Sequence, residues 1–270
     1  DENLRGIGYE QPLQISQSAG GTISLPMAEK APLLTLDSGP VAGVIGSVYL
    51  GKEMHLKNII TTDLGGTSFD VGVILEQAPV VSYKSLVNQY EYFLPKVDVQ
   101  TLGTGGGSQV WIEPATNSLR VGPQSAGADP GPVCYGRGGT IATTTDADLV
   151  LGYLDPDHFA GGTIKLDRQA AIDVIQKLAD KLKLGLYELA IGIATIAEFQ
   201  MADLIRRVTV QKGLDPREFT IFAFGGSGPT HMGVAARELG VQEVILSLIH
   251  ISEPTRLYAI SYGGLRLKKK

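Results

Sequence analysis

The sequence predicts an α/β protein, and three regions carry that prediction. Residues 59–74 read as two short strands joined by a tight Gly-Gly-Thr-Ser turn, and residues 41–50 before them read as a helix. Residues 167–182 and 186–210 carry apolar residues at helical spacing. Residues 219–239 read as a buried strand, a glycine loop and a helix. Strands and helices therefore alternate along the chain.

The composition is that of a globular protein that handles small ligands. The chain has 270 residues, of which 43% are hydrophobic and 19% charged, enough to bury a sizeable core. Its net charge of −5 predicts no nucleic-acid partner. No apolar run approaches the roughly 18 residues of a membrane span, which predicts no membrane insertion. The single cysteine, Cys134, fits a reducing cytoplasmic compartment, and we expect it to be structural rather than nucleophilic.

The two ends of the chain predict a fragment. The sequence begins Asp1-Glu2-Asn3 without a methionine, and from Leu246 it resembles a translated sequencing adapter that runs into a poly-A end. We expect one domain over residues 1–245 and a non-native tail over residues 246–270, with a natural basic tail as the alternative.

The elements before the hairpin are short. Residues 22–25 and 33–36 read as strand-like runs. Ser38-Gly39-Pro40 then predicts a helix start, with Ser38 as the cap and Pro40 at a first helical position.

The hairpin at 59–74 is a candidate phosphate-binding turn. Gly65 and Gly66 let the main chain approach an anion closely, and the hydroxyls of Thr67 and Ser68 add donors. Asp63, at the end of the first strand, is placed to hold a hydrated divalent cation or to orient a water. An ordinary tight hairpin with an aspartate at its rim is the alternative.

The region after the hairpin contains a second glycine cluster, at residues 103–108. It predicts a loop of exposed amides suited to an anion at Gly105, Gly106 and Gly107, or else a flexible hinge. Residues 109–113 and 118–121 then read as a hairpin.

Two predicted helices carry charged residues with open roles. A helix starts near residue 144 with Thr145 or Asp146 as its cap, which leaves Asp148 unexplained. Arg206 and Arg207 near the end of the long helix suit the helix macrodipole, with a phosphate contact as the alternative.

A third glycine segment follows the strand at 219–224. A strand, a glycine loop and a helix N-terminus form a geometry that suits a nucleotide or phosphate, although the spacing is not that of a Walker loop. His231, in the first helical turn, is a candidate metal ligand or general acid, or simply a polar residue of that turn. The candidate binding residues of the segment are Gly225, Gly226, Ser227, Gly228 and Pro229.

The order of these motifs resembles the second half of the actin-like ATPase (ribonuclease H-like) fold, here partial, with a mixed sheet flanked by helices. Residues 38–43, 122–139 and 145–152 resemble one branch of it, the A-type subunit of the hydantoinase/oxoprolinase family. The resemblance extends over residues 11–245.

The resemblance implies an enzyme that hydrolyses a cyclic amide at the expense of ATP, as N-methylhydantoinase and 5-oxoprolinase do. An ATP-dependent ketone carboxylase subunit is the first alternative. A nucleotide-switched binding protein of the chaperone or actin-like type is the alternative from a different functional class. The implied cofactors are ATP and Mg²⁺ or another divalent metal. The implied partners are a small cyclic amide or ketone and a B-type subunit in a hetero-oligomer.

The resemblance also implies roles for particular residues. By the resemblance, Asp63 contacts the hydrated metal. We further predict that Asp63 and Asp70 are the catalytic carboxylates and that His231 is a second metal ligand. The cofactor-binding residues are Gly65, Gly66, Thr67 and Ser68 for the β- and γ-phosphates, Gly105, Gly106 and Gly107 for phosphate or substrate, and Gly225, Gly226, Ser227, Gly228 and Pro229 for the adenosine. The first phosphate loop of such ATPases is absent, so we expect no ATP turnover by this chain alone.

Overall fold

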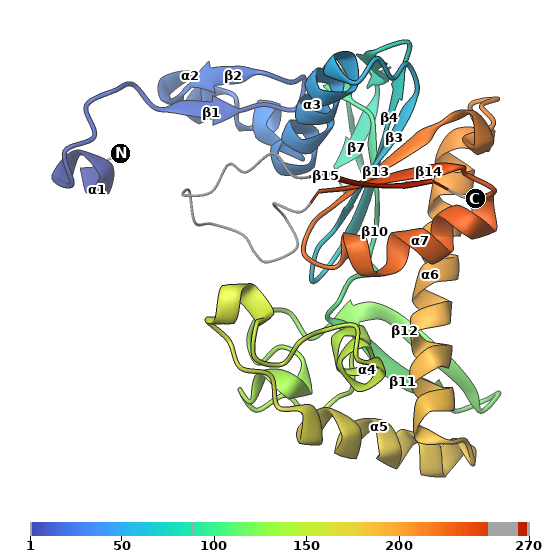
Figure 1. Ribbon diagram of the computed structural model, residues 1–270. Coiled ribbons are helices and arrows are strands. Elements are labelled where there is room, and N and C mark those ends of the chain that lie inside the picture. Colours follow the sequence, from blue (N-terminus) through green and yellow to red (C-terminus); the bar gives the residue numbers. More distant parts are fainter. Residues whose placement is uncertain (1, 88, 248–263, 269–270) are drawn as a thin grey trace. The chain divides into compact units, whose positions relative to one another are not determined.

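The computed structural model describes residues 2–87, 89–247 and 264–268 (Figure 1). The α-helices are α1 (Glu2–Gly6), α2 (Leu25–Lys30), α3 (Ser38–Glu53), α4 (Thr144–Leu151), α5 (Arg168–Leu182), α6 (Leu186–Val210) and α7 (Gly228–Leu239). The 3₁₀ turns are η1 (Pro32–Thr35), η2 (Val133–Tyr135), η3 (Phe159–Gly162) and η4 (Pro216–Glu218). The strands are β1 (Gln14–Ser16), β2 (Thr22–Ser24), β3 (Ile59–Leu64), β4 (Phe69–Leu75), β5 (Ala78–Pro79), β6 (Val81–Ser82), β7 (Ser85–Val87), β8 (Tyr90–Tyr92), β9 (Lys96–Val97), β10 (Val99–Leu102), β11 (Ser108–Glu113), β12 (Ser118–Ser125), β13 (Thr220–Phe224), β14 (Glu243–Ser247) and β15 (Gly264–Lys268).

The chain divides into two compact units. The first contains Asp1–Ile59 and Gly72–Val99, and the second contains Ile60–Val71 and Gln100–Lys270. Residues 248–263 and 269–270 of the expected tail lie outside the described residues, so its non-native origin stays a prediction.

The main sheet is mixed. Its strand order is β10-β4-β3-β13-β14-β15, with β5 paired to β4. β13 and β14 run parallel, whereas β4 and β5 run antiparallel. Helix α7 packs against β13 and β14. The predicted α/β class, with a mixed sheet flanked by helices, is confirmed.

The first unit corrects two predictions about short elements. Residues 33–36 do not form a strand, because Pro32 opens the 3₁₀ turn η1 instead. The helix predicted after residue 38 is present as α3, but Asp37 is its N-cap, in a left-handed conformation with φ 56°, and Ser38 is already helical. Pro40 is therefore the third helical residue rather than the first.

The second unit is built along α6, whose predicted bounds are confirmed. This helix contacts α4, α5, α7 and β12 (Figure 1). Ile193, Ala197, Met201, Ile205 and Val208 form a buried stripe along it, spaced as a helix that faces a core requires. Among the described residues, no helix has both the length and the hydropathy that a membrane crossing requires.

Asp146 fastens the glycine- and proline-rich loop after β12 to helix α4. The N-cap of α4 is Thr143, and Asp146 completes a capping box with it, so neither Thr145 nor Asp146 is the cap. The Asp146 carboxylate accepts from Thr143 N at 2.9 Å and from the Thr143 hydroxyl at 2.8 Å. It also accepts from Val133 N at 3.2 Å and Cys134 N at 2.8 Å. One buried carboxylate thus serves four donors from two segments.

Cys134 has the structural environment that we expected. Its side chain is buried, and burial raises the pKa of the thiol well above its ordinary value, an effect that the Asp146 charge increases. Both the burial and this shift favour a structural role for Cys134 over a nucleophilic one.

The anchoring role of Asp146 predicts a large loss of stability for Asp146→Ala. The change leaves buried N–H donors of residues 133 and 134 without an acceptor, which should cost about 2–4 kcal/mol. The matched control is Asp167→Ala, because Asp167 caps α5 through a single bond to Ala170 N at 2.9 Å, and it should cost only about 1 kcal/mol. Urea unfolding of both variants measures the difference, and equal losses would contradict the anchoring role.

Candidate functional site

The turn between β3 and β4 is the turn that the sequence predicted to bind phosphate, and part of its backbone is exposed. Gly65 N donates to Ser68 O at 3.0 Å and closes the turn. Gly66 and Thr67 are exposed, and within the described part of the chain no acceptor takes their N–H groups. A Cβ placed on Gly66 would meet nothing within 4 Å. The turn therefore has two N–H donors that the described part of the chain leaves without an acceptor.

Asp70 supports this turn through a hydrogen bond to Ser68. It is buried, and its Oδ2 accepts from the Ser68 hydroxyl at 3.0 Å while its Oδ1 accepts from the Thr101 hydroxyl on β10. Both carboxylate oxygens are thus engaged inside the fold, and Asp70 orients Ser68 rather than lining the exposed part of the turn.

The loop between β13 and α7 lies directly against the end of β3. Ser227 N donates to Leu64 O at 3.0 Å. Gly225 has a φ of +79°, and a Cβ there would lie 2.3 Å from Asp63 Oδ1 and 2.5 Å from Leu64 O. Only glycine permits both the conformation and the approach. The structure therefore brings together the first and third glycine segments, with Asp63 at their meeting point.

The outer part of the same loop remains open. Gly226 is exposed, and a Cβ there would meet nothing within 4 Å. Gly228 and Pro229 are the first two residues of α7, so the helix N-terminus follows at once. Open backbone at both Gly66 and Gly226 is the feature of this region that a ligand could use.

The second glycine segment does not expose its amides, and that expectation is wrong. Gly105, Gly106 and Gly107 are buried. Gly106 N donates to Gly65 O at 3.1 Å and Gly107 N to Gly66 O at 2.7 Å, while Gly105 N donates to the Ser108 hydroxyl at 2.8 Å. Their N–H groups are therefore not available to phosphate or substrate, and they support the hairpin turn instead.

The glycines of this segment are required by close packing. A Cβ on Gly105 would lie 2.7 Å from Gly65 O, and one on Gly106 would lie 2.8 Å from the Thr145 hydroxyl and 2.9 Å from the Ser227 hydroxyl. Thr145, in the first turn of α4, donates to Gly106 O through both its N–H and its hydroxyl, each at 2.8 Å. Composition alone indicated a loop here but not which partner required it.

His231 is buried in an ion cluster and is not placed as a metal ligand. Its Nε2 lies 3.1 Å from Asp148 Oδ2 and its Nδ1 lies 3.3 Å from Glu198 Oε1. Burial by itself lowers the pKa of His231, but the two carboxylates outweigh burial and hold it well above its ordinary value. An imidazolium that donates from both nitrogens has no lone pair for a metal, so we withdraw His231 from the metal site. Among the described residues, no group of three acidic, histidine or cysteine side chains could hold a metal ion.

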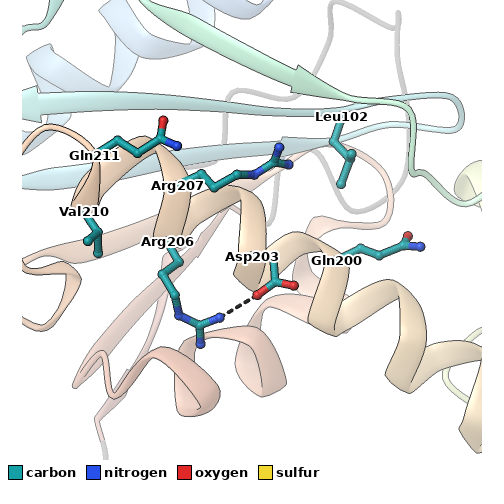
Figure 2. Close-up of a pocket in the computed structure, with 7 residues that line it drawn as sticks. All are labelled: Leu102, Gln200, Asp203, Arg206, Arg207, Val210 and Gln211. Carbon is teal, nitrogen blue, oxygen red and sulfur yellow. Dashed lines mark hydrogen bonds and ion pairs between the residues drawn. The ribbon is translucent and has the colours of Figure 1, made fainter.

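A separate pocket of about 450 Å³ lies along the C-terminal part of α6 (Figure 2). Figure 2 shows Arg206 and Arg207 leaving the helix in different directions. Arg206 is paired with Asp203 at 2.5 Å and with Glu238 at 3.6 Å, so its charge is neutralised within the protein. The sequence indicated the two arginines but not the pocket, which is lined by Leu102, Gln200, Asp203, Arg206, Arg207, Val210 and Gln211.

Comparisons with known proteins identify the family of the chain. The family model described as Hydantoinase/oxoprolinase matches residues 1–257. The caprolactamase subunit alpha of Pseudomonas jessenii is 39% identical over 247 residues, which make up 91% of this chain and 35% of that protein.

Two solved structures share the fold. The nucleotide-free structure of acetone carboxylase, reported with the mechanism of ATP-dependent acetone carboxylation, superposes with a TM-score of 0.86 at 35% identity and covers 93% of this chain and 35% of its own. The ATP-dependent caprolactamase of Pseudomonas jessenii superposes with a TM-score of 0.76 at 36% identity and covers 91% of this chain and 36% of its own.

The chain spans well under half the length of the curated relatives that it matches, for example 35% of the caprolactamase subunit. The family model nevertheless covers residues 1–257 of the 270. The chain belongs to the hydantoinase/oxoprolinase family.

Proposed function

We propose that this chain forms part of the ATP site of an enzyme that hydrolyses a cyclic amide of the hydantoin or 5-oxoproline type. The observation that carries the proposal is the meeting of two open backbone loops at Asp63. Ser227 N donates to Leu64 O at 3.0 Å, and Gly66 and Gly226 each face open space. Exposed N–H groups on one loop and a helix N-terminus on the other suit a polyphosphate with an attached nucleoside.

The residues present fit ATP in a defined way. In this proposal the turn from Gly65 to Ser68 holds the β- and γ-phosphates, and its exposed N–H groups stabilise their charge. The loop from Gly225 to Pro229 flanks the adenosine. Asp70 is a positioning residue, since it orients the Ser68 hydroxyl at 3.0 Å. When bound, ATP would supply the phosphoryl group that activates the amide oxygen.

Asp63 is the residue that we assign to Mg²⁺ or another divalent metal. Mg²⁺ in nucleotide sites keeps several waters and takes one or two carboxylates plus substrate phosphates, so a single aspartate is a sufficient protein ligand. That requirement agrees with the described residues, among which no preformed cluster of metal-binding side chains occurs.

The similarity to acetone carboxylase, with a TM-score of 0.86, favours ATP-dependent carboxylation of a ketone as the second candidate. In both cases we propose a hetero-oligomer with a B-type subunit, because the caprolactamase relative is itself named as a subunit. We also propose a cytoplasmic location, in keeping with a single buried free thiol at Cys134.

Nucleotide binding is tested by Gly66→Ala. The added methyl meets nothing within 4 Å in the protein, so stability should be unchanged or rise slightly. The methyl would occupy the space of the phosphates, and the affinity for Mg²⁺-ATP should fall about tenfold or more. Calorimetric titration compares the Mg²⁺-ATP affinity of Gly66→Ala with that of the unmodified chain and of Gly233→Ala. Gly233→Ala is an exposed change on α7 whose added methyl also meets nothing within 4 Å. If Gly66→Ala binds like Gly233→Ala, the turn does not contact the nucleotide.

Metal assignment is tested by Asp63→Asn. The neutral side chain should abolish most of the gain in ATP affinity that Mg²⁺ provides, while the affinity measured in EDTA stays the same. The control is Asp173→Asn on α5, whose carboxylate accepts from Gln169 at 2.8 Å and from no other donor among the described residues. An unchanged Mg²⁺ dependence in Asp63→Asn would remove Asp63 from the metal site.

The reaction is tested by ADP release from the chain alone and from its complex with the B-type partner. We expect no steady turnover by the chain alone and stimulation of the complex by 5-oxoproline, a hydantoin or caprolactam. Stimulation only by a ketone with bicarbonate would establish the carboxylase candidate instead. Stimulation by none of these compounds would favour a nucleotide-switched binding protein.

A further inference from the structure

The charged cluster around His231 is buried, and the proposed nucleotide contacts do not account for it. His231, Asp148 and Glu198 side chains are exposed by 0, 3 and 7%, and they come from α7, α4 and α6. Burying three ionisable groups is costly, and such clusters add little net stability compared with apolar packing. Their best-supported value is to fix one arrangement of the elements that carry them.

The buried carboxylate of Asp148 depends on His231 for a counter-charge. Its Oδ2 lies 3.1 Å from His231 Nε2, and its Oδ1 has no hydrogen-bond partner within the described residues. Glu198 contacts the other nitrogen of the same ring at 3.3 Å. One imidazolium therefore holds two buried carboxylates, and its removal leaves both without a counter-charge.

The helix that carries Asp148 also holds the second glycine segment. Thr145, three residues earlier on α4, donates twice to Gly106 O at 2.8 Å. Gly106 N in turn donates to Gly65 O in the hairpin turn at 3.1 Å. α4 is thus connected to the turn by a direct chain of hydrogen bonds.

The helix that carries His231 holds the third glycine segment. α7 begins at Gly228, three residues before His231, and the preceding Ser227 N donates to Leu64 O at 3.0 Å. The Asp148–His231 pair therefore closes a ring of contacts that runs through α4, the second glycine segment, the hairpin turn, β3, the third segment and α7.

We propose that His231 is a positioning residue that ties α7 to α4 and so holds the 225–228 loop against Asp63 and Leu64. The positional part depends only on the contacts described above. Its consequence for nucleotide affinity rests on the proposed function of the two loops.

Two neutral isosteres separate the links that His231 makes. His231→Gln places an amide nitrogen where Nε2 lies and keeps a donor to Asp148. His231→Asn places one where Nδ1 lies and keeps only the donor to Glu198. Both variants lose the charge and each keeps a different link, so the difference between them shows whether the Asp148 link or the Glu198 link matters more. Ile175→Ala is the control for general destabilisation, since Ile175 is fully buried on α5 and takes no part in the ring.

Hydrogen exchange of peptides covering residues 225–230 is the direct measurement. We expect exchange in His231→Asn to be about tenfold faster than in Ile175→Ala, with His231→Gln in between. If His231→Asn does not fold, Asp148→Asn, which keeps an oxygen acceptor but removes the charge, should show the same local acceleration. Exchange that is no faster than in Ile175→Ala would overturn the proposal.

Titration with Mg²⁺-ATPγS separates this inference from the proposed function. If the unmodified chain binds the nucleotide, His231→Asn should weaken binding about tenfold while Ile175→Ala does not. Equal affinities for the chain and His231→Asn would overturn the positioning role in nucleotide binding. If the unmodified chain does not bind the nucleotide, the proposed function fails, and the exchange experiment still decides the role of His231.

Discussion

The close approach of three main-chain segments is the constraint on which the site depends. A Cβ on Gly225 would lie 2.3 Å from Asp63 Oδ1, and a Cβ on Gly105 would lie 2.7 Å from Gly65 O. Real Cβ atoms do not approach other atoms this closely, so each contact exists only because the side chain is absent. The three segments are therefore not independent loops, since each fills the space that the next would need for a side chain.

The charged cluster around His231 adds a second set of contacts to those of the glycine segments. Helix α7 packs against α6, β13 and β14, and Asp148 and Glu198 contact the ring of His231 in its first turn. The glycines and the histidine of the segment from Gly225 to His231 consequently have different roles. Its glycines meet the end of β3 or face open space, and its histidine points into the core of the second unit.

The local sequence pattern was sufficient to predict the long helix and the hairpin, but not which distant residues contact the functional segments. The periodicity of residues 186–210 and the alternation around the Gly-Gly-Thr-Ser turn predicted α6 and the β3–β4 hairpin, because both depend on neighbours in sequence. The apolar run at 33–36 gave the wrong element, since Pro32 fixes a 3₁₀ turn there. The roles of Gly106 and His231 were inaccessible, because their partners Thr145 and Asp148 are 39 and 83 residues away.

The nature of the contacts explains why one architecture is found in both an amidase and a carboxylase. In the proposed site the nucleotide meets N–H groups of Gly66 and Thr67, one carboxylate at Asp63 and a helix N-terminus, none of which distinguishes a lactam from a ketone. Phosphoryl transfer needs positioning and charge stabilisation from the protein, and backbone donors supply these for any acceptor oxygen. Choice of substrate must therefore come from side chains beyond the three glycine segments. In this proposal, that separation accounts for two solved structures that share the fold and are 35% and 36% identical to this chain while the reactions named for them differ.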